Sequence, residues 1–289
     1  MAEIISNSYD ADASKVTITL TEVDGKPLEI KVVDDGKGLS LNEIQNKFLV
    51  IGRNRRNEEG DTPSAKYGRL PTGKKGLGKL ALFGLAKTIT IVTRQHGKQN
   101  EFVLDWDELN TAQGRYQPQA IQINQATTEA DGTTITLTQL KRESSFDCDG
   151  LADSLSRIFI FDENFHLFLQ APSGEVITID NQRKYESFKS EFEWSLESTN
   201  IVPSPSIYFG NVNGKLLTSN KPIAPVSGLR GIALFSRGKL VNAPEFFSSS
   251  TSSHFYQYLT GWISVDFIDL LPRMSYQPIA NRLTGNILT

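Results

Sequence analysis

The stretch Glu-Ile-Ile-Ser-Asn-Ser-Tyr-Asp-Ala at residues 3–11 decides the fold of this chain. Glu3, Asn7 and Asp10 are spaced i, i+4, i+7, so in a helix they share one face. The two isoleucines that follow Glu3 lie off this face and can pack against an apolar layer. Polar side chains aligned in this way beside an apolar body indicate a binding site and not a solvated helix face.

A second polar motif, Asp34-Asp-Gly36-Lys-Gly38, follows two strand-like runs. It places a carboxylate next to two glycines, whose backbone can adopt conformations that other residues avoid. Carboxylate and amide oxygens suit a hard cation such as Mg²⁺. Together the two motifs predict a pocket for a magnesium-bound nucleotide.

Length and composition set the protein class. The 289 residues predict one large domain or two ordinary domains, and 38% hydrophobic with 22% charged residues indicates a soluble globular protein. The net charge of −3 gives no overall attraction to nucleic acid or membrane. Cys148 is the single cysteine, which excludes an internal disulfide and favours a reducing, cytoplasmic location. No apolar run reaches membrane-spanning length, so no membrane partner is expected.

The order of elements in the first half can be predicted from periodicity and turn signals. A helix is expected at 2–13, and Asp24-Gly25 should join strands at 16–20 and 28–33 as a hairpin. A capping box formed by Ser40 and Glu43 should start a helix that runs to about Val50. The remaining patterns predict an apolar helix at 77–86 and strands near 88–94, 100–105, 119–124 and 133–139. This order predicts an α+β fold in which helices cover one face of a sheet.

The glycine-rich stretch Gly73-Lys-Lys-Gly76-Leu-Gly78-Lys79-Leu80 nearly matches a P-loop. Its last position fails, because a leucine has no hydroxyl for magnesium. The stretch also imitates a dinucleotide fingerprint, but no buried strand leads into either motif. Small residues that expose backbone N–H groups at a helix start still suit phosphate.

Four motifs now stand in a recognisable order: Glu3-x-x-x-Asn7-x-x-Asp10-Ala11, Asp34-x-Gly36-x-Gly38, Gly73-x-x-Gly76-x-Gly78 and Gly132-Thr133. This order resembles that of the GHKL ATPases, a superfamily that includes gyrase B, the ninety-kilodalton heat-shock chaperones, histidine kinases and MutL. The glycine-rich phrase looks closest to MORC-like and chaperone-like prokaryotic ATPases. The resemblance implies a Bergerat-type ATP-binding α/β sandwich at 1–140, followed by a transducer-like α+β domain at 141–289.

The resemblance also implies roles for individual residues. Glu3 would be the catalytic base that activates water, Asn7 would bind Mg²⁺, and Asp10 would support the pocket from the next helical turn. Asp34 would accept a hydrogen bond from the adenine amine. The other implied contacts to ATP come from Gly36, Gly38, Lys74, Lys75, Gly76, Leu77, Gly78, Lys79 and Thr133.

Residues 53–79 carry an excess of positive charge that the resemblance identifies as the ATP lid. The alternatives are a solvated basic loop or a DNA contact, although Tyr67 is the only aromatic residue in this stretch that could stack on a base. The basic residues are Arg53, Arg55, Arg56, Lys66, Arg69, Lys74, Lys75 and Lys79.

The second half shows a helix at 150–160, turns at 171–175 and 211–214, a hairpin at Arg237-Gly238 and an apolar strand at 262–267. In gyrase B and MutL the corresponding lobe sends a lysine to the γ-phosphate. No residue here matches that lysine clearly. Lys239, Arg273 and Arg282 are the candidates, and a plain surface charge is the alternative for each.

The predicted function is magnesium-dependent ATP binding with slow hydrolysis that drives a conformational or dimerisation cycle, as the N-terminal motor of a larger protein. The expected partners are ATP and ADP, a second copy of the chain, and a protein client or DNA. One alternative is a nucleotide-sensing module that does not hydrolyse ATP. Another is a phosphotransferase of the histidine-kinase type. Because only Met1 and Ala2 precede the first motif, the chain is expected to be a fragment or to lack an upstream segment.

Overall fold

The computed structural model describes residues 1–48, 62–72, 81–112, 116–186, 189–196, 212–246 and 254–267. Its contacts divide the chain into two compact units. The first unit comprises Met1–Ser156 and Phe161–Asp180, and the second comprises Arg157–Ile160 and Asn181–Thr289. Each unit is described by itself below.

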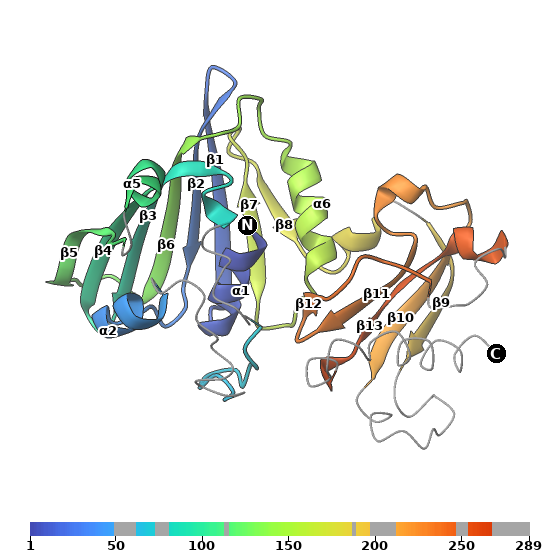
Figure 1. Ribbon diagram of the computed structural model, residues 1–289. Helices are drawn as coiled ribbons and strands as arrows, with labels where there is room; N and C mark the ends of the chain where they lie inside the picture. The colour runs from blue at the N-terminus through green and yellow to red at the C-terminus, as the bar shows by residue number, and fades with distance from the viewer. Residues whose placement is uncertain are drawn as a thin grey trace. The chain divides into compact units, whose positions relative to one another are not determined.

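A mixed sheet of eight strands forms the body of the first unit, in the order β5-β4-β3-β6-β2-β1-β7-β8 (Figure 1). Neighbouring strands are antiparallel except β1 and β7, which run parallel. The strands are β1 (Lys15–Val23), β2 (Lys26–Asp34), β3 (Ala86–Gln95), β4 (Lys98–Asp105), β5 (Gln119–Ala126), β6 (Gly132–Leu140), β7 (His166–Gln170) and β8 (Val176–Ile179).

The alternating pattern of β1 explains its place in the middle of this sheet. Val16, Ile18 and Leu20 are buried, while the threonines between them are partly exposed, as expected of a strand with one face on the core. Asp24 and Gly25 both have positive φ values, 52° and 73°, which a two-residue hairpin turn of this type requires. The predicted hairpin between β1 and β2 is therefore confirmed.

Among the described residues, the α-helices that accompany the sheet are short: α1 (Ala2–Asp10), α2 (Leu41–Glu43), α5 (Trp106–Thr111) and α6 (Cys148–Ile158). The predicted helix at 2–13 is confirmed but ends at Asp10. The capping box is also confirmed, because Ser40 accepts the Glu43 N–H and the Glu43 carboxylate accepts the Ser40 N–H. A π-helical turn at Ile44–Phe48 continues α2, and residues 49 and 50 lie outside the described residues.

The helix predicted at 77–86 is wrong at its C-terminal end, and its first residues, 77–80, lie outside the described residues. Residues 83–85 form a turn, and Ala86 is the first residue of β3, where its fully buried methyl group belongs to the core. The apolar run continued past the helix, so periodicity alone could not separate the two elements. The predicted strands at 88–94, 100–105, 119–124 and 133–139 are confirmed as β3, β4, β5 and β6.

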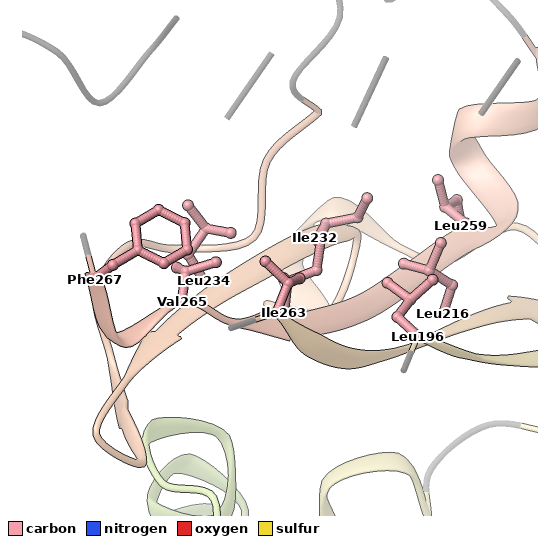
Figure 2. Close-up of a cluster of buried hydrophobic side chains, with 9 residues drawn as sticks. Leu196, Leu216, Ile232, Leu234, Leu259, Ile263, Val265 and Phe267 are labelled. Atoms are coloured by element: carbon pink, nitrogen blue, oxygen red, sulfur yellow. The ribbon is translucent and has the colours of Figure 1, made fainter. Parts of the chain in front are cut away.

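The second unit contains a five-stranded sheet in the order β12-β11-β13-β10-β9. Its core consists mostly of aliphatic side chains (Figure 2). The predicted hairpin at Arg237-Gly238 is confirmed. The turn predicted at 211–214 is wrong at its end, because residues 213 and 214 belong to a strand that pairs with β13. Asn211 lies outside the described residues. The strands are β9 (Ser190–Leu196), β10 (Asn213–Ser219), β11 (Gly231–Ser236), β12 (Lys239–Leu240) and β13 (Leu259–Ser264).

The fold is therefore α+β, with a mixed sheet and few helices, as the sequence predicts. The domain boundary expected between residues 140 and 141 stays a prediction; by contacts, α6 up to Ser156 and the strands β7 and β8 group with the first unit. Within the described ranges, no helix has the length and apolar character needed to cross a membrane.

Candidate nucleotide site

Helix α1 carries the first set of predicted site residues at different depths. Asn7 is exposed, Glu3 is half-buried, and Asp10 is 6% exposed. Ile4 and Ile5 are buried and fix the rotation of the helix. Glu3 lies in the first turn, where a negative charge interacts favourably with the helix dipole. The helix thus presents an exposed amide and a carboxylate along one side, as the i, i+4 spacing predicted.

Asp34, the last residue of β2, has a carboxylate that accepts three hydrogen bonds. Its Oδ2 atom accepts a hydrogen bond from the hydroxyl of Ser8 at 2.8 Å. Its Oδ1 atom accepts the backbone N–H groups of Gly36 at 3.0 Å and Thr133 at 3.2 Å. Three donors from three parts of the sequence therefore fix this side chain in one orientation.

The environment of Asp34 changes the pKa of its carboxyl group. Burial removes water from the carboxylate and raises its pKa above the ordinary value, although the hydrogen bonds from Ser8, Gly36 and Thr133 act in the opposite direction. A carboxylate held in this way is organised to recognise a hydrogen-bond donor on a ligand. The neighbouring Asp35 accepts hydrogen bonds from Ser14 and from the N–H of Lys15. Burial raises the pKa of Asp35, but these hydrogen bonds outweigh burial, so its pKa lies below the ordinary value.

Glycines beside Asp34 allow main chains to approach where a side chain would collide. A Cβ atom on Gly38, which has φ +64°, would lie 1.9 Å from the carbonyl oxygen of Arg94. A Cβ atom on Gly36 would lie 2.8 Å from the carbonyl oxygen of Ala11, and one on Gly132 would lie 2.3 Å from that of Asp34. The motif glycines therefore hold the strand ends and the end of α1 together.

Two threonines extend the polar network behind Asp34. Thr133 faces Asp34 across the β2–β6 ladder, and its hydroxyl lies 3.4 Å from that of Thr93 on β3. The Thr93 hydroxyl accepts the N–H of Leu39 at 2.8 Å. Thr133 is among the site residues predicted from the sequence, whereas Ser8 and Thr93 are not. Ser8 could have been found, because it lies between two motif residues on α1, whereas Thr93 carries no local signal.

Asp10 binds the segment that leads into the glycine motif. Its Oδ1 atom accepts both the backbone N–H and the hydroxyl of Thr72, each at 2.9 Å. Thr72 immediately precedes Gly73 in the sequence. The predicted support from Asp10 therefore has a structural counterpart within the described residues, although its role toward a ligand stays a prediction.

Arg69 does not behave as a free basic residue of a loop. It is 5% exposed, and its guanidinium carbon lies 4.3 Å from the ring centre of Tyr9, 4.4 Å from that of Tyr67 and 5.3 Å from that of Phe165. Arg69 is among the basic residues that the sequence assigns to the lid. That assignment is wrong, because burial between three rings removes this charge from solvent.

The other basic residues of the predicted lid fall into two groups. Lys66 is exposed, and its ammonium lies 4.6 Å from the ring centre of Tyr67. The rest lie outside the described residues: Arg53, Arg55, Arg56, Lys74, Lys75 and Lys79, together with the predicted phosphate contacts Gly76, Leu77 and Gly78.

The second-lobe candidates for a γ-phosphate contact stay predictions. Lys239 begins β12 of the second unit, while Arg273 and Arg282 lie outside the described residues. Among the residues that are described, no group of three or more histidine, cysteine, aspartate or glutamate side chains is placed to hold a metal ion.

Comparisons with known proteins point to an ATPase family for the first part of the chain. The family model described as "Histidine kinase-, DNA gyrase B-, and HSP90-like ATPase" matches residues 1–134. The chain is also 26% identical over 288 residues to a protein of Herpetosiphon aurantiacus named "Putative type II restriction enzyme HgiDII". That match covers 92% of this chain and 45% of the relative, so the chain spans about half the length of the curated relative. Residues 1–134, which include α1, Asp34 and Thr133, therefore match the family of histidine kinase-, gyrase B- and HSP90-like ATPases, in agreement with the GHKL resemblance of the sequence motifs.

Proposed function

We propose that this chain binds ATP with Mg²⁺ and hydrolyses the nucleotide slowly, and that the cycle drives a conformational change or dimerisation. One observation carries the proposal. The carboxylate of Asp34 is held by Ser8, Gly36 and Thr133 next to α1, the helix that presents Glu3 and Asn7. The match to an ATPase family supports ATP as the nucleotide.

Asp34 is the residue proposed to select adenine. Its two oxygens already accept three hydrogen bonds, and a carboxylate has about four acceptor positions, so one remains for a ligand donor. The exocyclic amine of adenine supplies such a donor, whereas guanine would present a carbonyl at this point. Gly36, Gly38 and Thr133 complete the proposed base-binding wall.

Asn7 and Glu3 are the residues proposed to act at the phosphates. The exposed amide oxygen of Asn7 fits a hard cation that takes few protein ligands and keeps waters and phosphate oxygens. When bound, Mg²⁺ would neutralise charge that develops on the phosphate oxygens. Glu3 would orient and deprotonate the attacking water. Lys74, Lys75, Gly76, Leu77, Gly78 and Lys79 are proposed to contact the phosphates, and Asp10 to support the pocket.

The proposed place of the chain is at the N-terminal end of a larger protein, with an ATP-binding domain at 1–140 and a transducer-like domain at 141–289. The length of the relative supports only the larger protein, because the chain covers 45% of it. A nucleotide-dependent homodimer is the proposed working form. Lys239, Arg273 and Arg282 stay the candidates for a contact from the second domain.

The relative's name supports a second candidate, a role connected with DNA. A protein named as a type II restriction enzyme shares sequence with nearly the whole chain. If the ATP cycle serves such a role, duplex DNA should change the rate of ATP hydrolysis. A rate that is the same with and without DNA would leave a protein client as the partner.

Turnover of radiolabelled ATP by the purified chain tests the main proposal directly. Release of phosphate that requires Mg²⁺ supports an ATPase. Saturable ATP binding without phosphate release would favour the nucleotide-sensing alternative. Label that appears on the protein itself would favour the phosphotransferase alternative.

A further inference from the structure

The end of α1 and the segment 62–72 are joined at several points, although more than 50 residues separate them in the sequence. Asp12, which has φ 59° and is 8% exposed, accepts hydrogen bonds from the hydroxyl of Ser64 and from the N–H groups of Lys66 and Tyr67. Burial would raise the pKa of Asp12, but these hydrogen bonds outweigh it and lower the pKa. Asp12 is therefore a carboxylate anion that binds residues 64–67, in the first half of the segment.

Arg69 fixes the middle of the same segment. Its guanidinium donates to the carbonyl oxygens of Ala13 at 2.6 Å, Tyr9 at 3.3 Å and Asn164 at 2.9 Å, and it lies 3.6 Å from the carboxylate of Asp162. The guanidinium therefore joins the backbone at and just after the end of α1 to the backbone at Asn164.

Thr72 fixes the end of the segment through the two hydrogen bonds to Asp10. The same helix carries Glu3 and Asn7, and through Ser8 it is bonded to Asp34. The point where the chain enters the glycine motif is therefore set relative to the proposed adenine, magnesium and water-activating groups by one short helix.

We infer that the C-terminal end of α1 and the segment 62–72 form one positioning element for the triphosphate, in which Asp10 and Arg69 are positioning residues. This inference rests on the proposed ATP binding. Neither residue needs to touch the nucleotide. Asp10 and Arg69 act by fixing Thr72, and thereby the residue before the glycine motif, against α1. Adenine recognition by Asp34 does not depend on these contacts.

The test compares two ligands, adenosine and a non-hydrolysable ATP analogue with Mg²⁺, in two variants of the full chain. Thr72→Val removes the hydroxyl but keeps the backbone hydrogen bond to Asp10, and Arg69→Lys keeps the charge but loses the planar fork. Each variant should bind the ATP analogue about fivefold or more weakly, because one or more positioning hydrogen bonds are lost. Affinity for adenosine should stay at the wild-type value.

Matched controls come from the same unit. Thr88→Val removes another threonine–aspartate hydrogen bond, 3.3 Å to Asp105, and Arg142→Met removes an arginine that donates to carbonyl groups of its own loop. Both controls should bind the two ligands as the wild type does.

The possible results distinguish a failure of the positioning role from a failure of the proposed ATP binding. Wild-type affinity for the ATP analogue in Thr72→Val and Arg69→Lys overturns the inference alone, as does an equal loss for both ligands in Thr72→Val. If Arg69→Lys does not fold, Thr72→Val decides. A wild-type chain that binds no ATP analogue overturns the proposed function, and the inference with it.

Discussion

The hydroxyl of Ser8 on α1 donates a hydrogen bond of 2.8 Å to the carboxylate of Asp34 at the end of β2, across 26 positions of sequence. This bond joins the helix that carries the proposed catalytic groups to the residue proposed to recognise adenine. It also favours the charged form of Asp34, against the effect of burial, which raises the pKa of that carboxyl.

Ser8→Ala should make ATP binding more sensitive to acid. The variant loses a hydrogen bond that lowers the Asp34 pKa, so the carboxyl should become protonated at a higher pH than in the wild type. A protonated Asp34 is a poorer acceptor for the adenine amine. Titration of ATP affinity from pH 8 down to pH 5 should show the loss beginning earlier in the variant. Coincident pH profiles would mean that Ser8 does not tune this carboxylate.

Asp34→Asn should weaken ATP binding and reduce the preference for ATP over GTP. The change leaves a neutral amide where a charged acceptor stood, and loss of such a hydrogen bond costs about 1–3 kcal/mol, or roughly fivefold to a hundredfold in affinity. Calorimetry with ATP and GTP measures both effects. Equal affinity of the wild type for the two nucleotides would contradict the assignment of Asp34.

Glu3→Ala should separate binding from turnover. The variant loses the proposed base but no proposed contact to adenine, so ATP affinity should change little while phosphate release falls by about 10²–10⁴-fold. Asn7→Ala provides the contrast, because loss of the proposed magnesium ligand should weaken Mg-ATP binding as well. Hydrolysis at the wild-type rate in Glu3→Ala would require another base.

Gly38→Ala should destabilise the first unit by about 2 kcal/mol or more, because the new methyl group would meet the carbonyl oxygen of Arg94 at 1.9 Å. Gly25→Ala is the matched control. Gly25 also has a positive φ, 73° against 64°, but a Cβ atom there meets nothing within 4 Å. The control should cost only about 1 kcal/mol from backbone strain. Urea unfolding of both variants measures the difference, and equal losses would show that the close contact is not the cause.

Lys184 should give the second unit a pH-dependent stability. It is 4% exposed, and its ammonium donates to the carbonyl oxygen of Phe159 at 3.0 Å and lies 4.6 Å from the ring centre of Phe235. Burial lowers its pKa from 10.5 to about 8. Between these values the unfolded chain binds more protons, so the Lys184 contribution to stability should rise with pH, by about 3 kcal/mol over the whole window.

Urea unfolding at pH 7.5 and pH 10 checks this sign. Other groups titrate in the same range, so the comparison is with Lys184→Met, in which the rise should be smaller, and with Lys221→Met, which removes an exposed lysine of the same unit. If Lys184→Met and Lys221→Met respond alike to pH, the buried ammonium does not control this dependence.

Elements with local sequence signals could be predicted without the structure. The hairpin at Asp24-Gly25 follows from two residues that tolerate positive φ, and the capping box from a serine and a glutamate three positions apart. The alternation of β1 predicted its buried face, and the spacing of Glu3, Asn7 and Asp10 predicted a shared helix. The motif order also indicated the ATPase family that matches residues 1–134.

The hydrogen-bond partners of the polar residues follow from tertiary contacts and not from local sequence. Nothing local in the sequence shows that Ser8 bonds Asp34, that Thr93 lies beside Thr133, or that Arg69 is enclosed by three rings and not exposed on a loop. Hydrogen bonds and burial depend on which distant segments the sheet and α1 bring together. The sequence around a basic residue does not show whether its side chain is solvated or buried. For that physical reason the motifs could be found from the sequence, and the network that holds them could not.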